Sequence, residues 1–284
     1  MSKYDAAYQT CPICAAGNIR QYHADFRGNR IFICPECTVQ FMNPVYSDGY
    51  LSDYYAGYYG GGLSDKEVAE GQRRNNKMKF RFIDKFTQPP GKVLDFGCGN
   101  GNFTNFSKEK GWDVLGYDVD CEAMKKVESG IGVPIKCGHF PDVDWKDKRF
   151  DLIHAHHVVE HLKHPVRDLK ILHKLLADDG YLYIGVPNIH AWSARVKLFL
   201  EKIGLKRSRI GKYYDSDHHV FYYTPQSMKV LLDICGFEVI LCKNGDKAHM
   251  SESRWVQVLM YDLLNYFYSN AAFFVIAQKK CNVN

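Results

Sequence analysis

Five of the chain's twelve histidines lie in one stretch, HAHHVVEHLKH, at positions 154–164. Imidazole groups can bind a metal ion, act as a general base near neutral pH or make structural hydrogen bonds, and the stretch alone fits all three roles. A helix that begins near His157 would bring His157, Glu160 and His161 to one face, because residues three and four apart are neighbours on a helix. We therefore take these three residues as candidate catalytic groups.

Four cysteines near the N terminus could bind a metal ion. They form two CxxC pairs with the spacing of a structural zinc site. The four are Cys11, Cys14, Cys34 and Cys37. Four thiolates complete a tetrahedral shell and leave no open position, so we expect a structural zinc ion and not a catalytic one. The residues between the pairs predict two short strands joined by the turn FRGN; the alternative is two reduced CxxC turns without metal.

The composition is typical of a globular protein: 46% of the 284 residues are hydrophobic and 24% are charged. The N-terminal MSKYDAAYQTCP has no apolar core of signal-peptide length, so we expect a cytoplasmic protein whose other six cysteines are free thiols and not disulfides. The longest apolar run, AAFFVIA at 271–277, is too short to span a bilayer.

Positive charge is concentrated in one segment. Between positions 195 and 212 the chain has seven lysine or arginine residues and one glutamate, so this segment has a net charge of +6. The whole chain has a net charge of +5, which leaves about −1 for the remainder. A general nucleic-acid-binding protein would carry basic residues along a broad face, so we expect no nucleic-acid partner.

The candidate groups depend on the elements that position them, and from Lys92 onward strands alternate with helices. The expected strands are 92–96, 112–118, 133–137, 149–155, 180–186, 237–242 and 271–278. The expected helices include 65–86, 165–178, 225–236 and 254–268. This alternation predicts an α/β fold with a doubly wound, mostly parallel seven-stranded sheet. We divide the chain into a zinc ribbon at 1–45, a connector and helical cap at 46–90, and the sheet domain at 91–284 with an insertion at 188–217.

A glycine-rich turn follows the first strand of the sheet domain. Its pattern is Gly97-x-Gly99-x-Gly101, and Asn102 stands where a dinucleotide fingerprint has its third glycine. The acidic Asp95 just before the turn would repel a pyrophosphate but can attract an ammonium or sulfonium group. These features disfavour a dehydrogenase.

The end of the second strand carries a further acidic residue. Asp118 is placed to accept hydrogen bonds from two ribose hydroxyls, 23 residues after Asp95. The glycine turn and Asp118 together predict a site for a nucleoside that carries a positive group.

At these residues the sequence resembles class I S-adenosylmethionine-dependent methyltransferases. VLDFGCGNG, LGYD, FDLIHAHHVVEHLKHP and LLADDGYLYIGVPN are similar to the successive motifs of that family. The segments CPIC…CPECTVQFMNPV…DYYAGYY are similar to a subgroup with an N-terminal zinc ribbon. Many members of the family serve surface-polysaccharide, nucleotide-sugar or secondary-metabolite pathways. The resemblance covers nearly the whole chain and implies S-adenosylmethionine as the cofactor.

The resemblance also implies which residues bind this cofactor. It assigns Asp95 and the glycine turn to the methionine part, Asp118 to the ribose, and His139 with Phe140 to the adenine. His139 departs from the family, which usually has an acidic residue at that place. The complete set of expected cofactor-binding residues is Asp95, Gly97, Cys98, Gly99, Gly101, Asp118, Val119, His139, Phe140 and His156.

Methyl transfer requires alignment of an acceptor with the methyl group, and a base only where the acceptor must lose a proton. The family commonly has a histidine shortly before a helix that a serine or threonine initiates, and His219 before Thr224 matches that place. We therefore add His219 to the catalytic candidates, whereas His154 and His164 are expected to be structural.

A second metal site is an alternative role for the same residues. In small-RNA 2′-O-methyltransferases and ubiquinone-pathway O-methyltransferases, a Glu-x-x-Glu-His motif holds a divalent metal. This chain has His157-x-x-Glu160-His161, and an imidazole in place of the first carboxylate would favour zinc, iron or manganese over magnesium. His219 would complete such a site.

The insertion predicts the type of acceptor. Apolar residues at helical spacing alternate there with basic residues over 192–212. It could cover an anionic acceptor, lie on an anionic membrane surface, or pack on its own domain. We expect O-methylation of a small polar acceptor such as a sugar or nucleotide sugar. The alternatives are a membrane-associated lipid or quinone acceptor, and a non-catalytic module that binds the cofactor and a partner.

Overall fold

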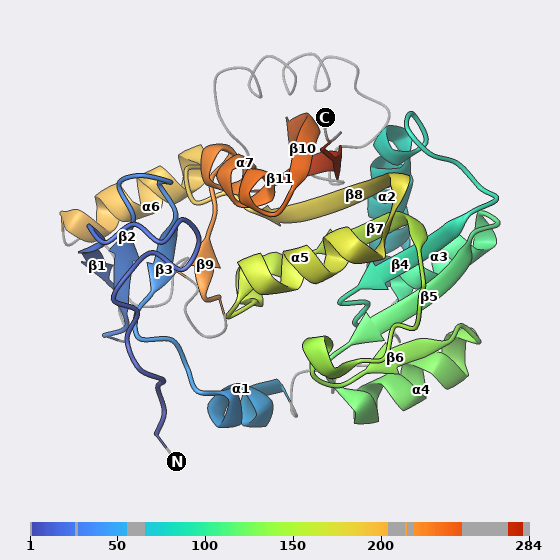
Figure 1. The fold of residues 1–284 in the computed structure, drawn as a ribbon, viewed down its shortest axis with the longest axis horizontal. Helices are drawn as coiled ribbons and strands as arrows, with labels where there is room; N and C mark the ends of the chain where they lie inside the picture. The colour runs from blue at the N-terminus through green and yellow to red at the C-terminus, as the bar shows by residue number, and fades with distance from the viewer. Residues whose placement is uncertain are drawn as a thin grey trace.

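A seven-stranded sheet forms the centre of the computed structural model, which describes residues 2–25, 28–55, 66–203, 214, 219–245 and 272–280 (Figure 1). Its strands are β4 (Lys92–Phe96), β5 (Asp113–Asp118), β6 (Ile135–Cys137), β7 (Phe150–His156), β8 (Leu176–Pro187), β10 (Phe237–Asn244) and β11 (Ala272–Lys279). Their order across the sheet is β10-β11-β8-β7-β4-β5-β6. Strand β11 runs antiparallel to both of its neighbours, β8 and β10, and the remaining strand pairs are parallel. The predicted doubly wound, mostly parallel sheet is therefore confirmed.

Helices cover both faces of this sheet. On one face lie α2 (Lys66–Ile83) and α3 (Asn102–Glu109), which bury Phe80 and Phe103 against β4 and β7. On the other face, α5 (Pro165–Leu175) and α7 (Pro225–Ile234) bury leucines against β7 and β8. Helix α4 (Cys121–Ile131) packs beside β6, at the far edge from β10 (Figure 1). Two packed layers of helix around one sheet leave the carboxyl ends of the parallel strands as the edge where a ligand can bind.

Several helices begin and end where their sequences predict. The Thr224 side chain accepts the N–H of Ser227 and forms a capping box, and Pro225 occupies the first turn of α7. Asp120 caps α4 by accepting from the N–H groups of Glu122 and Ala123, and Gly132 ends that helix at φ 60°.

One boundary differs from the prediction. Helix α5 ends at Leu175, whereas the sequence pattern extends a helix to Asp178. The next residue, Leu176, already belongs to β8 and pairs with Phe150 of β7. The apolar spacing of this segment fits a helix, but pairing with the neighbouring strand decides its conformation.

A second, four-stranded sheet lies at the N-terminal side of the molecule (Figure 1). Its order is β1-β2-β3-β9, with β1 (Arg20–Ala24), β2 (Arg30–Ile33), β3 (Gln40–Met42) and β9 (Phe221–Tyr222). Strands β1 and β2 match the two short strands expected between the CxxC pairs. The outer strand β9 comes from the region that the sequence assigns to the sheet domain, so the two parts of the chain share one sheet.

The prediction that all cysteines outside the CxxC pairs are free thiols is wrong in part. Cys121 and Cys137 form a disulfide, whereas Cys98, Cys235 and Cys242 are free. The disulfide joins the start of α4 to the end of β6, which are brought together by the packing of the helix on the strand and not by any local pattern.

Part of the predicted architecture lies outside the described residues. This is true of the helix expected at 254–268 and of the basic residues Lys206, Arg207, Arg209 and Lys212. The start of the insertion forms helix α6 (Trp192–Lys202), and the connector contains helix α1 (Asp48–Tyr55). Among the described helices, none is long and apolar enough to cross a membrane.

Candidate active site

The glycine turn between β4 and α3 has a backbone conformation that other residues rarely adopt. Gly97, Gly99 and Gly101 have φ angles of 76°, 51° and 74°. The N–H of Gly97 donates to the Tyr117 carbonyl at 2.8 Å, which fixes the turn to β5. A Cβ atom at Gly97 would overlap the Val158 side chain. Glycine is therefore required here for both conformation and close packing.

Asp118 at the end of β5 holds the same turn from the other side. Its Oδ2 atom accepts the N–H of Gly99 at 2.9 Å, and its Oδ1 atom accepts the N–H of Val119 at 2.8 Å. The residue is 5% exposed. A carboxylate can accept about four hydrogen bonds, so holding two backbone N–H groups is compatible with holding two ribose hydroxyls.

A cavity of about 900 Å³ extends from Asp118 along the ends of the strands. Its lining includes the residues expected around an adenine. The Phe140 ring packs edge-on against Phe96, with the ring centres 4.6 Å apart. The exposed His139 is bonded through Nδ1 to Asp142 Oδ2 at 2.9 Å, so a carboxylate lies beside the histidine that replaces the family's acidic residue. Val119 also lines this cavity.

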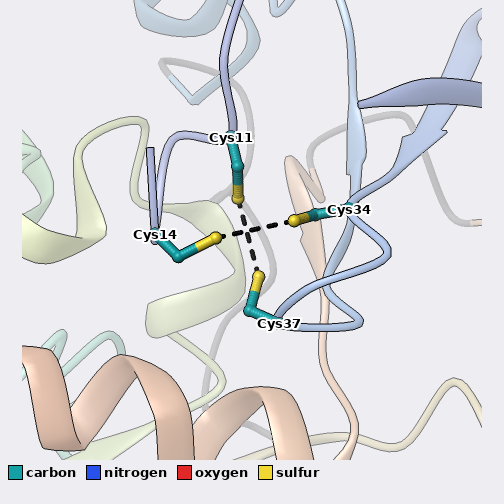
Figure 2. Close-up of side chains that lie close together, drawn as sticks. All are labelled: Cys11, Cys14, Cys34 and Cys37. Carbon is teal, nitrogen blue, oxygen red and sulfur yellow. Dashed lines mark hydrogen bonds between the residues drawn. The ribbon is translucent and has the colours of Figure 1, made fainter. Parts of the chain in front are cut away.

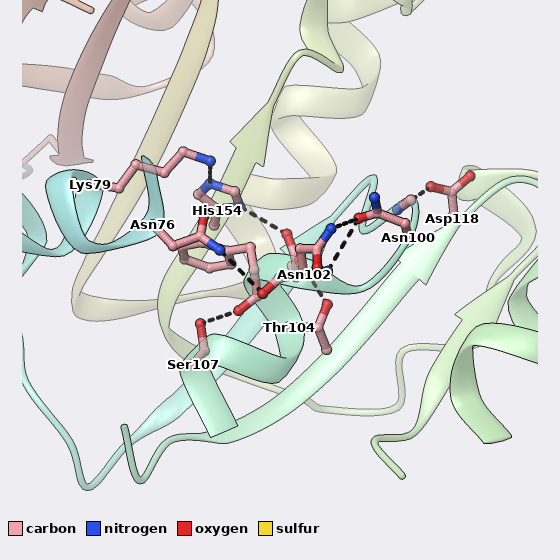
Figure 3. Close-up of polar contacts among 11 residues, drawn as sticks. Asn76, Lys79, Asn100, Asn102, Thr104, Ser107, Asp118 and His154 are labelled. Atoms are coloured by element: carbon pink, nitrogen blue, oxygen red, sulfur yellow. Dashed lines mark hydrogen bonds and ion pairs between the residues drawn. The ribbon is translucent and has the colours of Figure 1, made fainter. Parts of the chain in front are cut away.

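Asp95, two residues before the glycine turn, belongs to a buried chain of polar groups. Figure 3 labels three of its members, Thr104, His154 and Lys79. The Oδ1 atom of Asp95 is 2.8 Å from Nδ1 of His154, and its Oδ2 atom accepts the Thr104 hydroxyl at 2.6 Å. On the far side of the ring, His154 Nε2 is 3.3 Å from Nζ of Lys79, which reaches in from α2. Burial lowers the pKa of His154 to about 4. The ring is therefore neutral at pH 7, donates to Asp95 and accepts from Lys79.

Sequence reasoning did not identify Lys79 as part of the site. Burial lowers the pKa of its amine to about 8, while the negative charge of Asp95 opposes that shift. A signal was present, because Lys79 lies three and four residues before Phe82 and Ile83, on the apolar side of a predicted helix. A lysine in such a position has to be paired or to face a polar cavity.

Lys79 and Asp95 line a second cavity, of about 830 Å³. Carboxamide side chains are frequent in its wall, and they come from α2 and from the glycine turn: Gln72, Asn75, Asn76, Asn100 and Asn102. Cys98, Gly99 and His156, which were expected to contact the cofactor, also line it. Gly97 and His157 line both cavities, so the two meet at the carboxyl ends of β4 and β7.

The helix expected to begin at His157 is not formed. His157 has a left-handed backbone with φ 57°, and its N–H donates to the Gly185 carbonyl of β8 at 2.8 Å. After it comes only a short 3-10 turn, Val159–His161. The three candidate residues are therefore not on one helix face: His157 Nδ1 contacts Glu160 Oε1 at 3.0 Å, whereas the His161 ring lies against the ring of His219.

His161 instead meets His219, which arrives from the other side of the insertion. The ring centres are 4.8 Å apart, and both rings line the 900 Å³ cavity that contains Asp118. Glu160 is 1% exposed, and among the described residues its Oε2 atom has no hydrogen-bonding partner. One ligand atom from each of Glu160, His161 and His219 lies within 4.8 Å of the others. The group could act on an acceptor proton or hold a divalent ion.

The four N-terminal cysteines also come together (Figure 2). The sulfur atoms of Cys11 and Cys37 are 3.6 Å apart, and those of Cys14 and Cys34 are 3.5 Å apart. Zinc–sulfur bonds of about 2.3 Å in a tetrahedron place sulfur atoms about 3.8 Å apart. We call these residues the four-cysteine cluster, and its dimensions fit a zinc ion.

Comparisons with known proteins agree with this geometry. A family model described as a methyltransferase domain matches residues 70–241. An uncharacterized methyltransferase of Staphylococcus carnosus is 31% identical over 96 residues, 33% of this chain and 46% of that protein. A ubiquinone biosynthesis O-methyltransferase of Idiomarina loihiensis is 27% identical over 127 residues, 41% of this chain and 52% of that protein. The chain thus spans about half the length of these curated relatives.

Solved structures share the fold. The Burkholderia thailandensis 1,6-didemethyltoxoflavin-N1-methyltransferase, crystallised with S-adenosylhomocysteine, superimposes with a TM-score of 0.55 at 16% identity and covers 92% of this chain and 100% of that one. An S-adenosylmethionine-dependent methyltransferase from Clostridium acetobutylicum has a TM-score of 0.53 at 11% identity, with 81% and 100% coverage.

Proposed function

The chain belongs to the methyltransferase-domain family, and from that premise we propose that it transfers a methyl group from S-adenosylmethionine to a hydroxyl of a small polar acceptor, such as a sugar or nucleotide sugar. One observation carries the proposal. Asp118, the candidate ribose ligand, and the His161–His219 pair line the same 900 Å³ cavity. A cofactor held at one end of this cavity and an acceptor held at the other would meet inside it.

The residues of the site fit the cofactor. The glycine turn lets the backbone approach a ligand closely, and Asp118 supplies a fixed carboxylate for hydroxyl groups. When bound, S-adenosylmethionine supplies a methyl group on a positively charged sulfur. The buried Asp95 carboxylate and the Gly97–His157 junction of the two cavities lie where such a positive centre would be stabilised.

The histidine pair would manage the acceptor proton. An imidazole nitrogen of His161 or His219 would accept the proton from the acceptor hydroxyl while its oxygen gains the methyl group. Glu160, buried behind the pair, would stabilise the resulting imidazolium. His157, bonded to Glu160 Oε1, would fix the orientation of that carboxylate.

Transfer assays with purified protein test the proposal. Methyl-labelled S-adenosylmethionine is incubated with a panel of sugars and nucleotide sugars, and product is followed by mass. We expect His161→Ala or His219→Ala to lower kcat about 100-fold or more, because general-base catalysis contributes roughly that much. His173→Gln is the matched control, since His173 contacts Gly236 and Phe237 outside both cavities. Absence of transfer to every sugar, together with transfer to a quinol, would sink the sugar assignment.

Two further results would redirect the proposal. If calorimetry detects no binding of S-adenosylmethionine or S-adenosylhomocysteine, the protein is a non-catalytic module. If chelation abolishes transfer while the four-cysteine cluster keeps its zinc, Glu160, His161 and His219 hold a second ion instead of acting as a base.

A lipid or quinone acceptor is the second candidate, and the surface of α6 favours it. Trp192 and Phe199 of α6 and Ile203 directly after it are 56%, 61% and 49% exposed, and Arg195 and Lys197 lie between them in the sequence. Exposed apolar side chains beside basic ones suit the surface of an anionic membrane. For this candidate, we expect the protein to co-sediment with anionic vesicles at low salt. Phe199→Ser should abolish the sedimentation, whereas Ile240→Ser on β10 should not. No sedimentation would remove it.

A further inference from the structure

The four-cysteine cluster is joined to the acceptor side of the site through a shared sheet. Strand β3 of the N-terminal sheet pairs with β9, which comes from a segment about 180 residues later in the chain. Phe41 lies opposite Phe221, and both rings are buried, with their centres 6.1 Å apart. The N-terminal sheet is therefore not a separate module attached to the domain by a linker.

A short backbone path leads from the cluster into β3. In the second CxxC turn, the N–H of Thr38 donates to the Cys34 carbonyl at 2.9 Å, and the N–H of Cys34 donates to the Val39 carbonyl at 3.0 Å. Only Thr38 and Val39 separate Cys37 from the first residue of β3, Gln40. A metal ion that fixes Cys34 and Cys37 would fix the start of this strand.

From β3 the path continues to the candidate base. The N–H of Met42 donates to the Val220 carbonyl at 2.9 Å, and the N–H of Val220 donates to the Glu160 carbonyl at 2.9 Å. His219 is the residue directly before Val220. The backbone of Val220, next to His219, is thus held between the N-terminal sheet on one side and the Glu160 turn on the other.

The cofactor side is held by different contacts. The glycine turn and Asp118 are bonded to each other and to β5. Among the backbone–backbone hydrogen bonds of the described residues, none joins residues 11–42 to residues 95–118. Loss of order in the N-terminal sheet should therefore reach the acceptor side first and leave the cofactor side intact.

We propose that the four-cysteine cluster, when it holds its metal ion, positions His219 against His161 and Glu160 through the β3–β9 pairing. The cluster acts as a positioning device for the acceptor side, and it is not only a stabiliser of the N-terminal segment. The role of His219 as a base rests on the proposed function, but the coupling between metal and segment 219–222 does not.

Hydrogen exchange followed by mass spectrometry tests the coupling without any acceptor. The full chain is compared with zinc bound, after removal of the metal by a chelator, and after zinc is restored. We expect amide exchange in the peptide that contains Val220 and Tyr222 to become at least tenfold faster without metal and to recover with zinc. Exchange in β4 and the Kd for S-adenosylhomocysteine, measured by calorimetry, should change less than threefold.

Variants give a second measurement. Cys37→Ser should reproduce the effect of the chelator, whereas Cys242→Ser, which changes a free thiol in β10, should have no effect. If Cys37→Ser does not fold, the chelated native protein still decides the result. The proposal is overturned if the protein binds no metal, if exchange at 219–222 is unchanged without metal, or if β4 and cofactor affinity change to the same extent. A protein that shows the expected exchange but transfers no methyl group would refute the proposed function and leave this coupling in place.

Discussion

Replacement of Asp118 by asparagine should weaken cofactor binding in a protein that still folds. The side chain keeps its shape, but one acceptor oxygen becomes an NH2 group and the charge is lost. In the protein, both oxygens of Asp118 accept backbone N–H groups, from Gly99 at 2.9 Å and Val119 at 2.8 Å. An NH2 group would face one of these donors, so we expect the free energy of unfolding to fall by about 1–3 kcal/mol.

The effect on the cofactor should be of similar size. Hydrogen bonds to a charged group contribute about 1.5–3 kcal/mol, and at least one ribose hydroxyl would lose such a bond. This corresponds to a Kd for S-adenosylhomocysteine that is about 10- to 150-fold weaker. Calorimetric titration well below the melting temperature measures it, with circular dichroism to establish that the variant is folded.

Asp113→Asn is the control for this experiment. Asp113 begins the same strand β5, at its opposite end, and is exposed. We expect its Kd to be unchanged and its stability to lie within about 0.5 kcal/mol of the native protein. Asp118 is not the ribose ligand if folded Asp118→Asn binds S-adenosylhomocysteine within twofold of the native Kd, or if both variants weaken binding equally.

Three further predictions concern the scaffold. Gly97→Ala should lower the free energy of unfolding by about 2–5 kcal/mol, because φ is 76° and a Cβ would overlap a neighbouring valine. Gly71→Ala in α2, with open space around it, should raise the free energy of unfolding by about 0.5–1 kcal/mol. Equal urea midpoints for the two variants would contradict this prediction. The buried His154, with its pKa lowered to about 4, should stay neutral in the folded state while the unfolded chain gains a proton near pH 6.5. Stability should therefore fall by up to about 3 kcal/mol as the pH decreases from 6.5 to 4, and an NMR titration that shows protonation of this ring near 6.5 would refute the assignment. Reduction of the Cys121–Cys137 disulfide, whose cysteines are 16 residues apart, should lower the free energy of unfolding by about 3 kcal/mol. The Cys121→Ser/Cys137→Ser double variant should not respond to the reductant. A urea midpoint of the native protein that reductant does not change would contradict the disulfide.

The architecture followed from local patterns because each strand and helix carries its own period. The alternation of short apolar runs with amphipathic segments located all seven strands of the main sheet. The boundary at Leu176 was missed because a run such as LLAD continues a helical pattern. Only the pairing of Leu176 with Phe150, a tertiary contact, makes that residue extended.

The candidate site was predictable in its residue types but not in its grouping. The spacing of His157, Glu160 and His161 suggested one helix face, yet the left-handed backbone at His157 turns His161 toward His219. That backbone is fixed by a bond to Gly185 on a neighbouring strand, which no local pattern reveals. Lys79 was missed for the same reason, since its partner His154 lies 75 residues away.

The link between the N-terminal sheet and the acceptor side could not be read from the sequence either. Strand β9 has only two residues, Phe221 and Tyr222, too few for a periodic signal. Its pairing with β3 depends on where the whole domain places both segments.

A crystal structure of the protein with S-adenosylhomocysteine tests the central claim most directly. We expect both ribose hydroxyls within hydrogen-bonding distance of Asp118 and the sulfur at the Gly97–His157 junction, facing His161 and His219 across the 900 Å³ cavity. A ligand that binds away from Asp118, or a sulfur that faces away from both histidines, would contradict it.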